Sequence, residues 1–172
     1  LENNDFEKLY IKLAFGGTKE KTTIEFEDAT RKIFEQFGFK ATKEDLKKKS
    51  GKKKSEIEIF LTNGKESAIV DSKSYANGYS LGAGQKDTMI RYINDFKDFK
   101  IGKKKHSLTF FAYVYGKSTG SMDNFYEIIK VTGMSGSRIS ARELLLLLEQ
   151  FNAKKISKKE IWKLFQKNGE IT

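Results

Sequence analysis

Two acidic residues and a lysine with regular spacing carry the clearest chemical signal in this sequence. Asp71 and Lys73 are two residues apart in a strand-like run, so their side chains point to the same side of that strand. Glu56 and Glu58 have the same relation in the strand-like run before it. The turn sequence Thr62-Asn63-Gly64-Lys65 joins the two runs into a predicted hairpin, which brings one of the two glutamates across from Asp71.

This set of groups suits the hydrolysis of phosphodiester bonds. Carboxylates, together with the main-chain carbonyl of Ser72 between Asp71 and Lys73, are the hard oxygen ligands that Mg²⁺ prefers. Such an ion polarises a phosphoryl oxygen and lowers the pKa of a bound water, and a nearby lysine can position that water. The same spacing also fits an ordinary exposed strand with alternating charges, so the D-x-K pattern alone leaves both interpretations open.

Composition narrows the possible chemistry. The 172-residue chain contains no cysteine, which excludes disulfides, thiolate zinc sites and cysteine nucleophiles. His106 is the only histidine, and we expect it to be a surface residue and not a catalyst. Carboxylates and lysines must therefore carry any reaction. The length predicts a single domain covering residues 1–172.

The charge balance points to a polyanionic partner. Thirty-three Lys and Arg residues against 23 Asp and Glu give a formal net charge of +10, which favours binding to phosphates but also fits a solvated, lysine-rich surface. No apolar run approaches the ~18 residues that a membrane-spanning helix needs. We therefore expect no association with a membrane.

The elements that must position these groups alternate between helices and strands. Periodicity and caps predict helices at 5–15, from Thr22 or Thr23 to Phe37, at 85–96, at 124–131, and after Ser140 and Ser157. Strands are predicted at Ser55–Leu61, Ser67–Lys73 and Ser107–Tyr115, and the lysine-rich stretch 43–54 is predicted as a loop. The order predicts an α/β domain with a small mixed sheet flanked by helices.

The residues around the D-x-K pattern resemble a known family. Residues 69–81 read IVDSKSYANGYSL and residues 84–93 read GQKDTMIRYI. These segments resemble the cleavage domain of FokI-type (type IIS) restriction endonucleases, which carry an IVDTKAYxxGYxL…GQADEMxRYV pattern. The C-terminal NGEI at 168–171 is similar as well. The resemblance covers most of the chain and implies a restriction-endonuclease-like PD-(D/E)xK fold.

The resemblance also implies an active site. Asp71 and Lys73 match the D-x-K half of the family motif directly. Glu56 falls at the position of the first acid, where the family has Asp, and Glu58 is an alternative on the same face. With Ser72 contributing its carbonyl, this set implies a Mg²⁺-dependent endodeoxyribonuclease in which Mn²⁺ can substitute for the metal.

One further acid follows from the same resemblance. The family has a glutamate on the helix before the motif, in an FE or LE pair. Phe26-Glu27 is similar and makes Glu27 a weaker candidate, although a shift of register would put Glu25 there instead.

Partners follow from the family as well. Double-stranded DNA is the implied substrate, with Lys52, Lys53, Lys54 and Tyr75 as expected phosphate contacts. The implied partner copy pairs through the helix at 85–96. A separate DNA-recognition domain is expected upstream, so that the chain would be a fragment of a longer enzyme with little sequence preference of its own. The family resemblance also implies a cytoplasmic protein of a prokaryote.

Residues Asp87 and Arg91 carry the implied two-fold contact of a transient homodimer, with Asp87 of one copy meeting Arg91 of the other. At i and i+4 they could also form an ion pair within one helix. A non-catalytic DNA-binding or dimerisation module on a degenerate nuclease fold, and a nuclease that acts on RNA, are the alternatives to the DNA nuclease.

Overall fold

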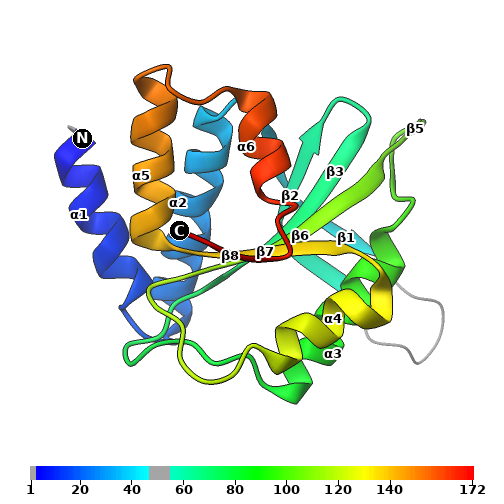
Figure 1. Cartoon of the computed structure of the whole chain (residues 1–172), viewed down its shortest axis with the longest axis horizontal. Helices are drawn as coiled ribbons and strands as arrows, with labels where there is room; N and C mark the ends of the chain where they lie inside the picture. The colour runs from blue at the N-terminus through cyan, green and yellow to red at the C-terminus, as the bar shows by residue number, and fades with distance from the viewer. Residues whose placement is uncertain (1–2, 47–54) are drawn as a thin grey trace.

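A computed structural model describes residues 3–46 and 55–172 of the chain. The helices and strands in chain order are α1 (Asn3–Ala14), α2 (Glu20–Gln36), β1 (Lys40–Leu46), β2 (Ser55–Asn63), β3 (Glu66–Lys73), α3 (Ala83–Phe96), β4 (Lys100–Ile101), β5 (Lys104–Lys105), β6 (Ser107–Tyr115), α4 (Asp123–Thr132), β7 (Ser135–Ser140), α5 (Ala141–Asn152), α6 (Lys158–Leu164) and β8 (Gly169–Ile171). Figure 1 shows how they are arranged.

A mixed sheet of six strands organises the domain, with the order β1-β2-β3-β6-β7-β8. The first three strands are antiparallel neighbours, and β2 is joined to β3 by the turn around Gly64, whose φ of 63° suits the predicted hairpin. From β3 onward every pairing is parallel, so helices must carry the chain back across the sheet between strands. This arrangement confirms the predicted α/β fold with a mixed sheet flanked by helices.

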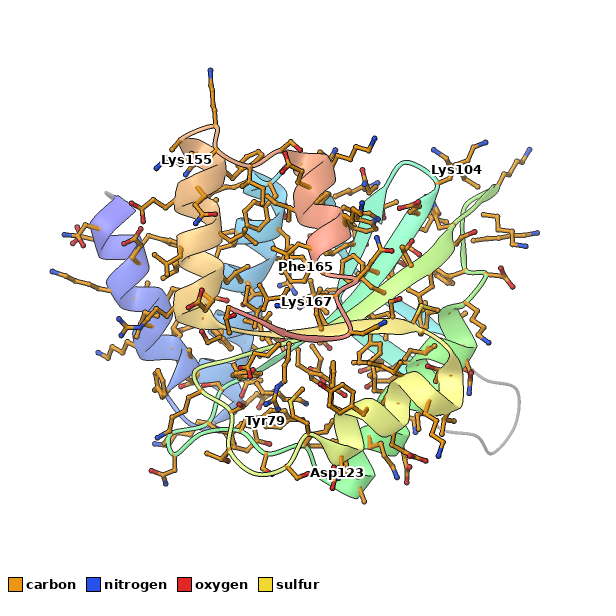
Figure 2. All side chains as sticks on the ribbon, in the orientation of Figure 1. Tyr79, Lys104, Asp123, Lys155, Phe165 and Lys167 are labelled. Atoms are coloured by element: carbon orange, nitrogen blue, oxygen red, sulfur yellow. The ribbon has the colours of Figure 1, made fainter. Side chains whose placement is uncertain are left out.

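The sheet is buried on both faces, by different sets of helices. One face packs against α1, α2, α5 and α6, and the other packs against α3 and α4 (Figure 1). Strand β6 lies between them with an almost continuous apolar sequence, because its side chains alternate between two cores. Phe110 belongs to the first core and Phe111 to the second. In Figure 2, Phe165 lies inside the first layer, whereas Lys104 and Lys155 extend outward.

The helix caps read from the sequence are present in the last third of the chain. The Ser140 hydroxyl accepts a hydrogen bond from the main-chain N–H of Glu143 at 3.1 Å. Ser157 and Glu160 form a reciprocal capping box at the start of α6. These local contacts need only four consecutive residues, which is why the sequence alone predicts them.

Two predictions near the N-terminus are wrong. Helix α2 begins at Glu20, earlier than the predicted caps Thr22 and Thr23, and its N-cap Lys19 makes no side-chain cap. Part of the stretch 43–54 that was predicted as a loop forms the edge strand β1, while residues 47–54 lie outside the described residues. Charged side chains are common on edge strands, so the lysine content of this segment concealed its strand character.

The strands β7 and β8 and the short β4–β5 hairpin were not predicted either. Strand β7 contains Ser135, Gly136 and Ser137, which have low strand propensity, and it is held by parallel pairing to β6. His106 is also a correction, because it lies buried at 4% exposure and not at the surface. Its main-chain N–H donates to the carbonyl of Phe99 at the base of the hairpin.

Candidate active site

Strands β2 and β3 separate at one end and leave a cleft between them. Their pairing runs from Asn63↔Glu66 to Ile59↔Val70, although β2 begins at Ser55 and β3 continues to Lys73. The space has a volume of about 280 Å³, and we call it the β2–β3 cleft. Its lining residues are Glu27, Glu56, Ile57, Glu58, Ile69, Val70, Asp71, Lys73, Gln85, Thr88 and Tyr92.

A bulge in β2 lies at the mouth of this cleft. The β1–β2 register changes from Thr42↔Phe60 to Glu44↔Ile57, so β2 has one residue more than β1 between these pairs. Glu58 is in this interval. A bulge bends its strand and redirects side chains, and bulges are frequent beside active sites. The local backbone therefore turns β2 away from β3 at the residue that carries one of the candidate acids.

Asp71 and Lys73 share one side of β3, as their spacing predicts. The Lys73 ammonium lies 3.1 Å from Oδ2 of Asp71, and both side chains are about three-quarters buried. Burial acts to lower the pKa of Lys73, but the charge of Asp71 and its hydrogen bond more than offset this, and the pKa is raised above its ordinary value. Lys73 is thus positively charged and acts as a hydrogen-bond donor in the site.

Helix α2 adds a third carboxylate to the same cleft. Burial above all, followed by the negative charges of Glu58 and Asp71, raises the pKa of Glu27 from its ordinary 4.5 to about 7. All three acids line the β2–β3 cleft. Glu25, the other candidate on this helix, is exposed and lies 4.0 Å from the Lys21 ammonium.

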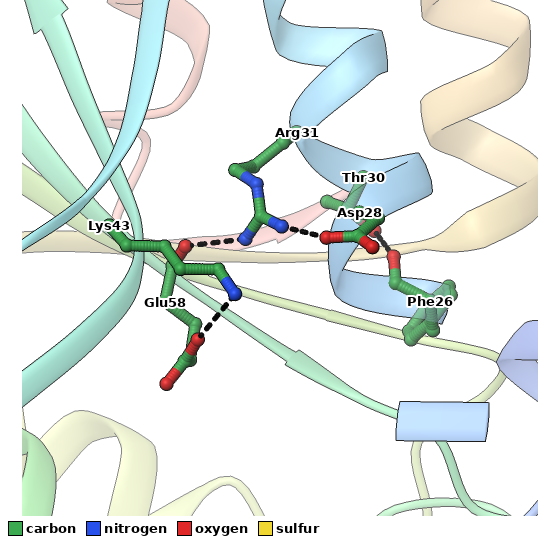
Figure 3. Close-up of polar contacts among 6 residues, drawn as sticks. All are labelled: Phe26, Asp28, Thr30, Arg31, Lys43 and Glu58. Carbon is green, nitrogen blue, oxygen red and sulfur yellow. Dashed lines mark hydrogen bonds and ion pairs between the residues drawn. The ribbon is translucent and has the colours of Figure 1, made fainter. Parts of the chain in front are cut away.

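The two candidate glutamates of β2 have different surroundings. Glu58 is half-exposed, and its carboxylate lies 3.7 Å from the Lys43 ammonium (Figure 3). Glu56 is exposed and lies opposite Asp45 of β1 in the strand register. Both line the cleft, but Glu58 is the less exposed of the two and lies in the bulge of β2. The inner position is therefore that of Glu58.

The donor set fits a hard divalent cation. All three inner groups offer carboxylate oxygens, and their mutual repulsion, visible in the raised pKa of Glu27, is what a bound dication would neutralise. In residues 3–46 and 55–172, no three His, Asp or Glu side chains already converge at ligand distances. Mg²⁺ commonly uses one or two carboxylates and completes its shell with water, so this spacing does not conflict with such a site.

Helix α3 supplies a wall that the sequence analysis did not assign to the site. Gln85, Thr88 and Tyr92 all line the cleft, at the i, i+3 and i+7 spacing of one helix face. Gln85 links two tyrosines, accepting from the Tyr79 hydroxyl at 2.8 Å and donating to the Tyr75 hydroxyl at 3.2 Å. The helical spacing was the available signal, but it gave no reason to connect this face with Asp71.

Other predicted site residues lie apart or outside the described residues. Ser72 has a buried side chain on β3 between Asp71 and Lys73. Tyr75 packs against Tyr79 beside the cleft, with the ring centroids 5.2 Å apart and the rings tilted by 38°. The three lysines predicted to contact phosphates, Lys52, Lys53 and Lys54, lie outside the described residues.

The proposed dimer residues lie on α3 away from the cleft-lining face. Asp87 is 73% exposed and lies 4.0 Å from the Lys86 ammonium. Arg91 stacks over the Tyr92 ring at 5.5 Å, and its Nε is buried without a hydrogen-bond partner. Among the ion pairs of the described residues there is none between Asp87 and Arg91, so the helix does not use them to stabilise itself.

A mixed sheet whose separating strands hold carboxylates and a lysine defines a restriction-endonuclease-like α/β domain. The chain belongs to the family "FokI, cleavage domain", whose sequence model matches residues 2–172. It is thus a cleavage domain of the type found in type II restriction enzymes.

Two curated relatives agree with this assignment. The type II restriction enzyme StsI of Streptococcus sanguinis is 29% identical over 177 residues, which cover 94% of this chain and 28% of that enzyme. The type II restriction enzyme FokI of Planomicrobium okeanokoites is 31% identical over 114 residues, which cover 60% of this chain and 20% of that enzyme. The chain therefore spans less than a third of the length of either relative.

Solved structures support the fold. The restriction endonuclease FokI superimposes with a TM-score of 0.71 at 23% identity, over 94% of this chain and 30% of that one. FokI bound to DNA gives the same TM-score and identity over 96% of this chain and 30% of that one. Among the described residues, no helix is long and apolar enough to cross a membrane.

Proposed function

We propose that this domain is a Mg²⁺-dependent endodeoxyribonuclease that hydrolyses phosphodiester bonds of double-stranded DNA with little sequence preference of its own. The observation that carries the proposal is the β2–β3 cleft, which gathers Glu58, Asp71 and Lys73 in a chain of the FokI cleavage domain family. Mn²⁺ is expected to replace Mg²⁺, because it accepts the same oxygen ligands.

The metal ligands in this proposal are Asp71, Glu58 and the Ser72 carbonyl. We prefer Glu58 over Glu56 because Glu58 is less exposed and lies at the bulge of β2 beside the cleft. Glu56 remains the alternative, since it also lines the cleft and occupies the family position of the first acid. When bound, Mg²⁺ would polarise the scissile phosphoryl oxygen and make a bound water more acidic.

Protein groups do the positioning and charge stabilisation. Lys73, kept protonated by Asp71, can orient the attacking water and stabilise negative charge on the phosphorus oxygens. Glu27, with a pKa raised to about 7, can accept a proton near neutral pH from a group in the cleft. Tyr75 and the lysines 52–54 are proposed to contact the DNA backbone.

The recognition of DNA sequence is assigned to another part of the protein. The net charge of +10 supports binding to phosphates, which carry no sequence information. FokI has been solved bound to DNA, and this chain corresponds to only 30% of that structure's length. We propose that a recognition domain lies upstream and that two copies of the present domain pair through α3 to cut both strands.

Supercoiled plasmid tests the proposal. With Mg²⁺ the protein should nick or linearise the DNA, and EDTA should stop the reaction. Asp71→Ala and Lys73→Met should each lose at least about 100-fold in rate, the usual effect of removing a group that stabilises the transition state. Lys86→Met is a matched control, because Lys86 is as buried as Lys73 and also pairs with an aspartate.

The outcomes separate the alternatives. No cutting at high protein concentration, with Asp71→Ala indistinguishable from the parent protein, would identify a non-catalytic DNA-binding module. A parallel digest of DNA and RNA of equal length decides between the two substrates, and faster cutting of RNA would contradict the DNA nuclease.

A further inference from the structure

Arg31 connects helix α2 to the bulged strand β2. Its Nη1 donates a hydrogen bond to the main-chain carbonyl of Glu58 at 2.7 Å, and its Nη2 pairs with Asp28 one turn earlier (Figure 3). The side chain is only 12% exposed. A guanidinium in this setting forms strong, directional, charge-assisted hydrogen bonds, and its geometry fixes the groups that accept them.

The Glu58 carbonyl lies at a point of β2 where regular pairing with both neighbouring strands is interrupted. The β2–β3 pairing ends at Ile59↔Val70, so β3 provides no ladder partner for Glu58. The bulge also interrupts the pairing with β1 at this residue. A buried or half-buried carbonyl needs a donor, and Arg31 provides one at this point of β2.

Arg31 also faces the carboxylates of the cleft. It follows Glu27 by four residues on α2, so both side chains leave the helix on the same face. Glu27 itself lines the β2–β3 cleft together with Glu58 and Asp71. Arg31 therefore bonds to the strand that carries Glu58 and shares a helix face with Glu27.

We propose that Arg31 is a positioning residue that holds Glu58 at the bulge, so that its carboxylate can meet Asp71 across the cleft. The proposal rests on the proposed function, in which both acids bind the metal. Groups that orient metal ligands without touching the metal commonly change metal affinity 10–100-fold when they are removed.

A purely structural role for Arg31, as an anchor of α2 on the sheet, is the competing explanation. Arg138 is a matched control, because its side chain is 11% exposed and its Nη2 lies 3.3 Å from Oε2 of Glu170. It is on β7, beyond β6 from the cleft. Replacing either arginine should cost similar stability, but only Arg31 contacts a strand that bears a proposed metal ligand.

The experiment measures Mn²⁺ binding without DNA, by electron paramagnetic resonance, in the parent protein and in Arg31→Met, Arg31→Lys and Arg138→Met. The expected result is an increase in the Mn²⁺ dissociation constant of about 10–100-fold for Arg31→Met and less than about threefold for Arg138→Met. The dissociation constant of Arg31→Lys should lie between these two, since an ammonium can reach one acceptor but cannot bond to the Glu58 carbonyl and Asp28 with the planar geometry of a guanidinium.

Hydrogen exchange in the metal-free protein provides a second measurement. The amides of Glu58 and Ile59 should exchange faster in Arg31→Met than in the parent protein, and should be unchanged in Arg138→Met. Equal Mn²⁺ affinity in Arg31→Met and Arg138→Met would overturn the proposal. If the parent protein bound no Mn²⁺, the proposed function would fail, and unchanged exchange at Glu58 in Arg31→Met would then overturn the positioning role separately.

Discussion

The acids of the β2–β3 cleft repel one another in the absence of metal, and this repulsion contributes to the raised pKa of Glu27. Its pKa is raised to about 7 by burial first and then by the charges of Glu58 and Asp71. The folded protein therefore binds a proton between pH 4.5 and about 7 that the unfolded chain has released. By linkage, this glutamate lowers the stability of the fold as the pH rises through that interval.

Replacement of this charge should consequently stabilise the metal-free protein. At pH 8 with EDTA, Glu27→Gln is expected to raise the melting temperature by about 2–4 °C, the response to about 1 kcal/mol in a domain of this size. At pH 5 the gain should disappear, because Glu27 is then already protonated. Melting curves at the two pH values measure the difference.

The matched control is Glu25→Gln, two residues away on the exposed side of α2. An exposed pair of this kind contributes little, so the melting temperature should change by less than about 2 °C at either pH. A gain at pH 8 from Glu25→Gln but not from Glu27→Gln would show that the sequence register of the helix acid had been assigned to the wrong residue.

At the scale of elements, the sequence predicted the helices and strands that depend on a few consecutive residues. It missed the strands that form only by pairing with distant segments. The hairpin at Asn63-Gly64, the buried strand β6 and the capped helices α5 and α6 each depend on a few consecutive residues. Strands β7 and β8 depend on parallel pairing with distant segments, which no short pattern encodes.

The residues of the candidate site also fall into a group that the sequence predicted and a group that it did not. The β2–β3 hairpin with Asp71 and Lys73 followed from spacing, and the resemblance added Glu27. Arg31 was not predicted, because its contact with Glu58 joins residues 27 positions apart through a helix–sheet interface. Single-sequence patterns carry no information on such a contact, which only the folded arrangement creates.

Strand β7 can form because Gly136 leaves room for its neighbour. A Cβ at this position would overlap the ring of Phe111, which lies directly opposite on β6. We expect Gly136→Ala to destabilise the domain by about 1–3 kcal/mol, the range for overpacked cores. Urea unfolding measures this, with Gly84→Ala as control, because a Cβ at Gly84 would meet nothing within 4 Å. Equal stability of the two variants would contradict the close approach of the strands.

At the scale of the whole molecule, we propose that a second copy in the opposite orientation cuts the second strand, since one cleft holds one set of catalytic groups. Helix α3 is the proposed contact, since Gln85 and Tyr92 line the cleft while Asp87 is turned to solvent. Arg91 has a buried Nε without a partner in the single chain. A two-fold contact between Asp87 of one copy and Arg91 of the other would pair both groups.

Charge exchange at these positions tests the dimer. Asp87→Arg or Arg91→Asp alone should abolish linearisation of plasmid while leaving nicking, because each places like charges together across the axis. An equimolar mixture of the two variants should restore linearisation, since opposite charges again meet. Asp98→Arg is the control, because Asp98 is similarly exposed and pairs with Lys105 just beyond α3. Linearisation by Asp87→Arg at the parent rate, or the absence of rescue in the mixture, would place the second copy on another surface.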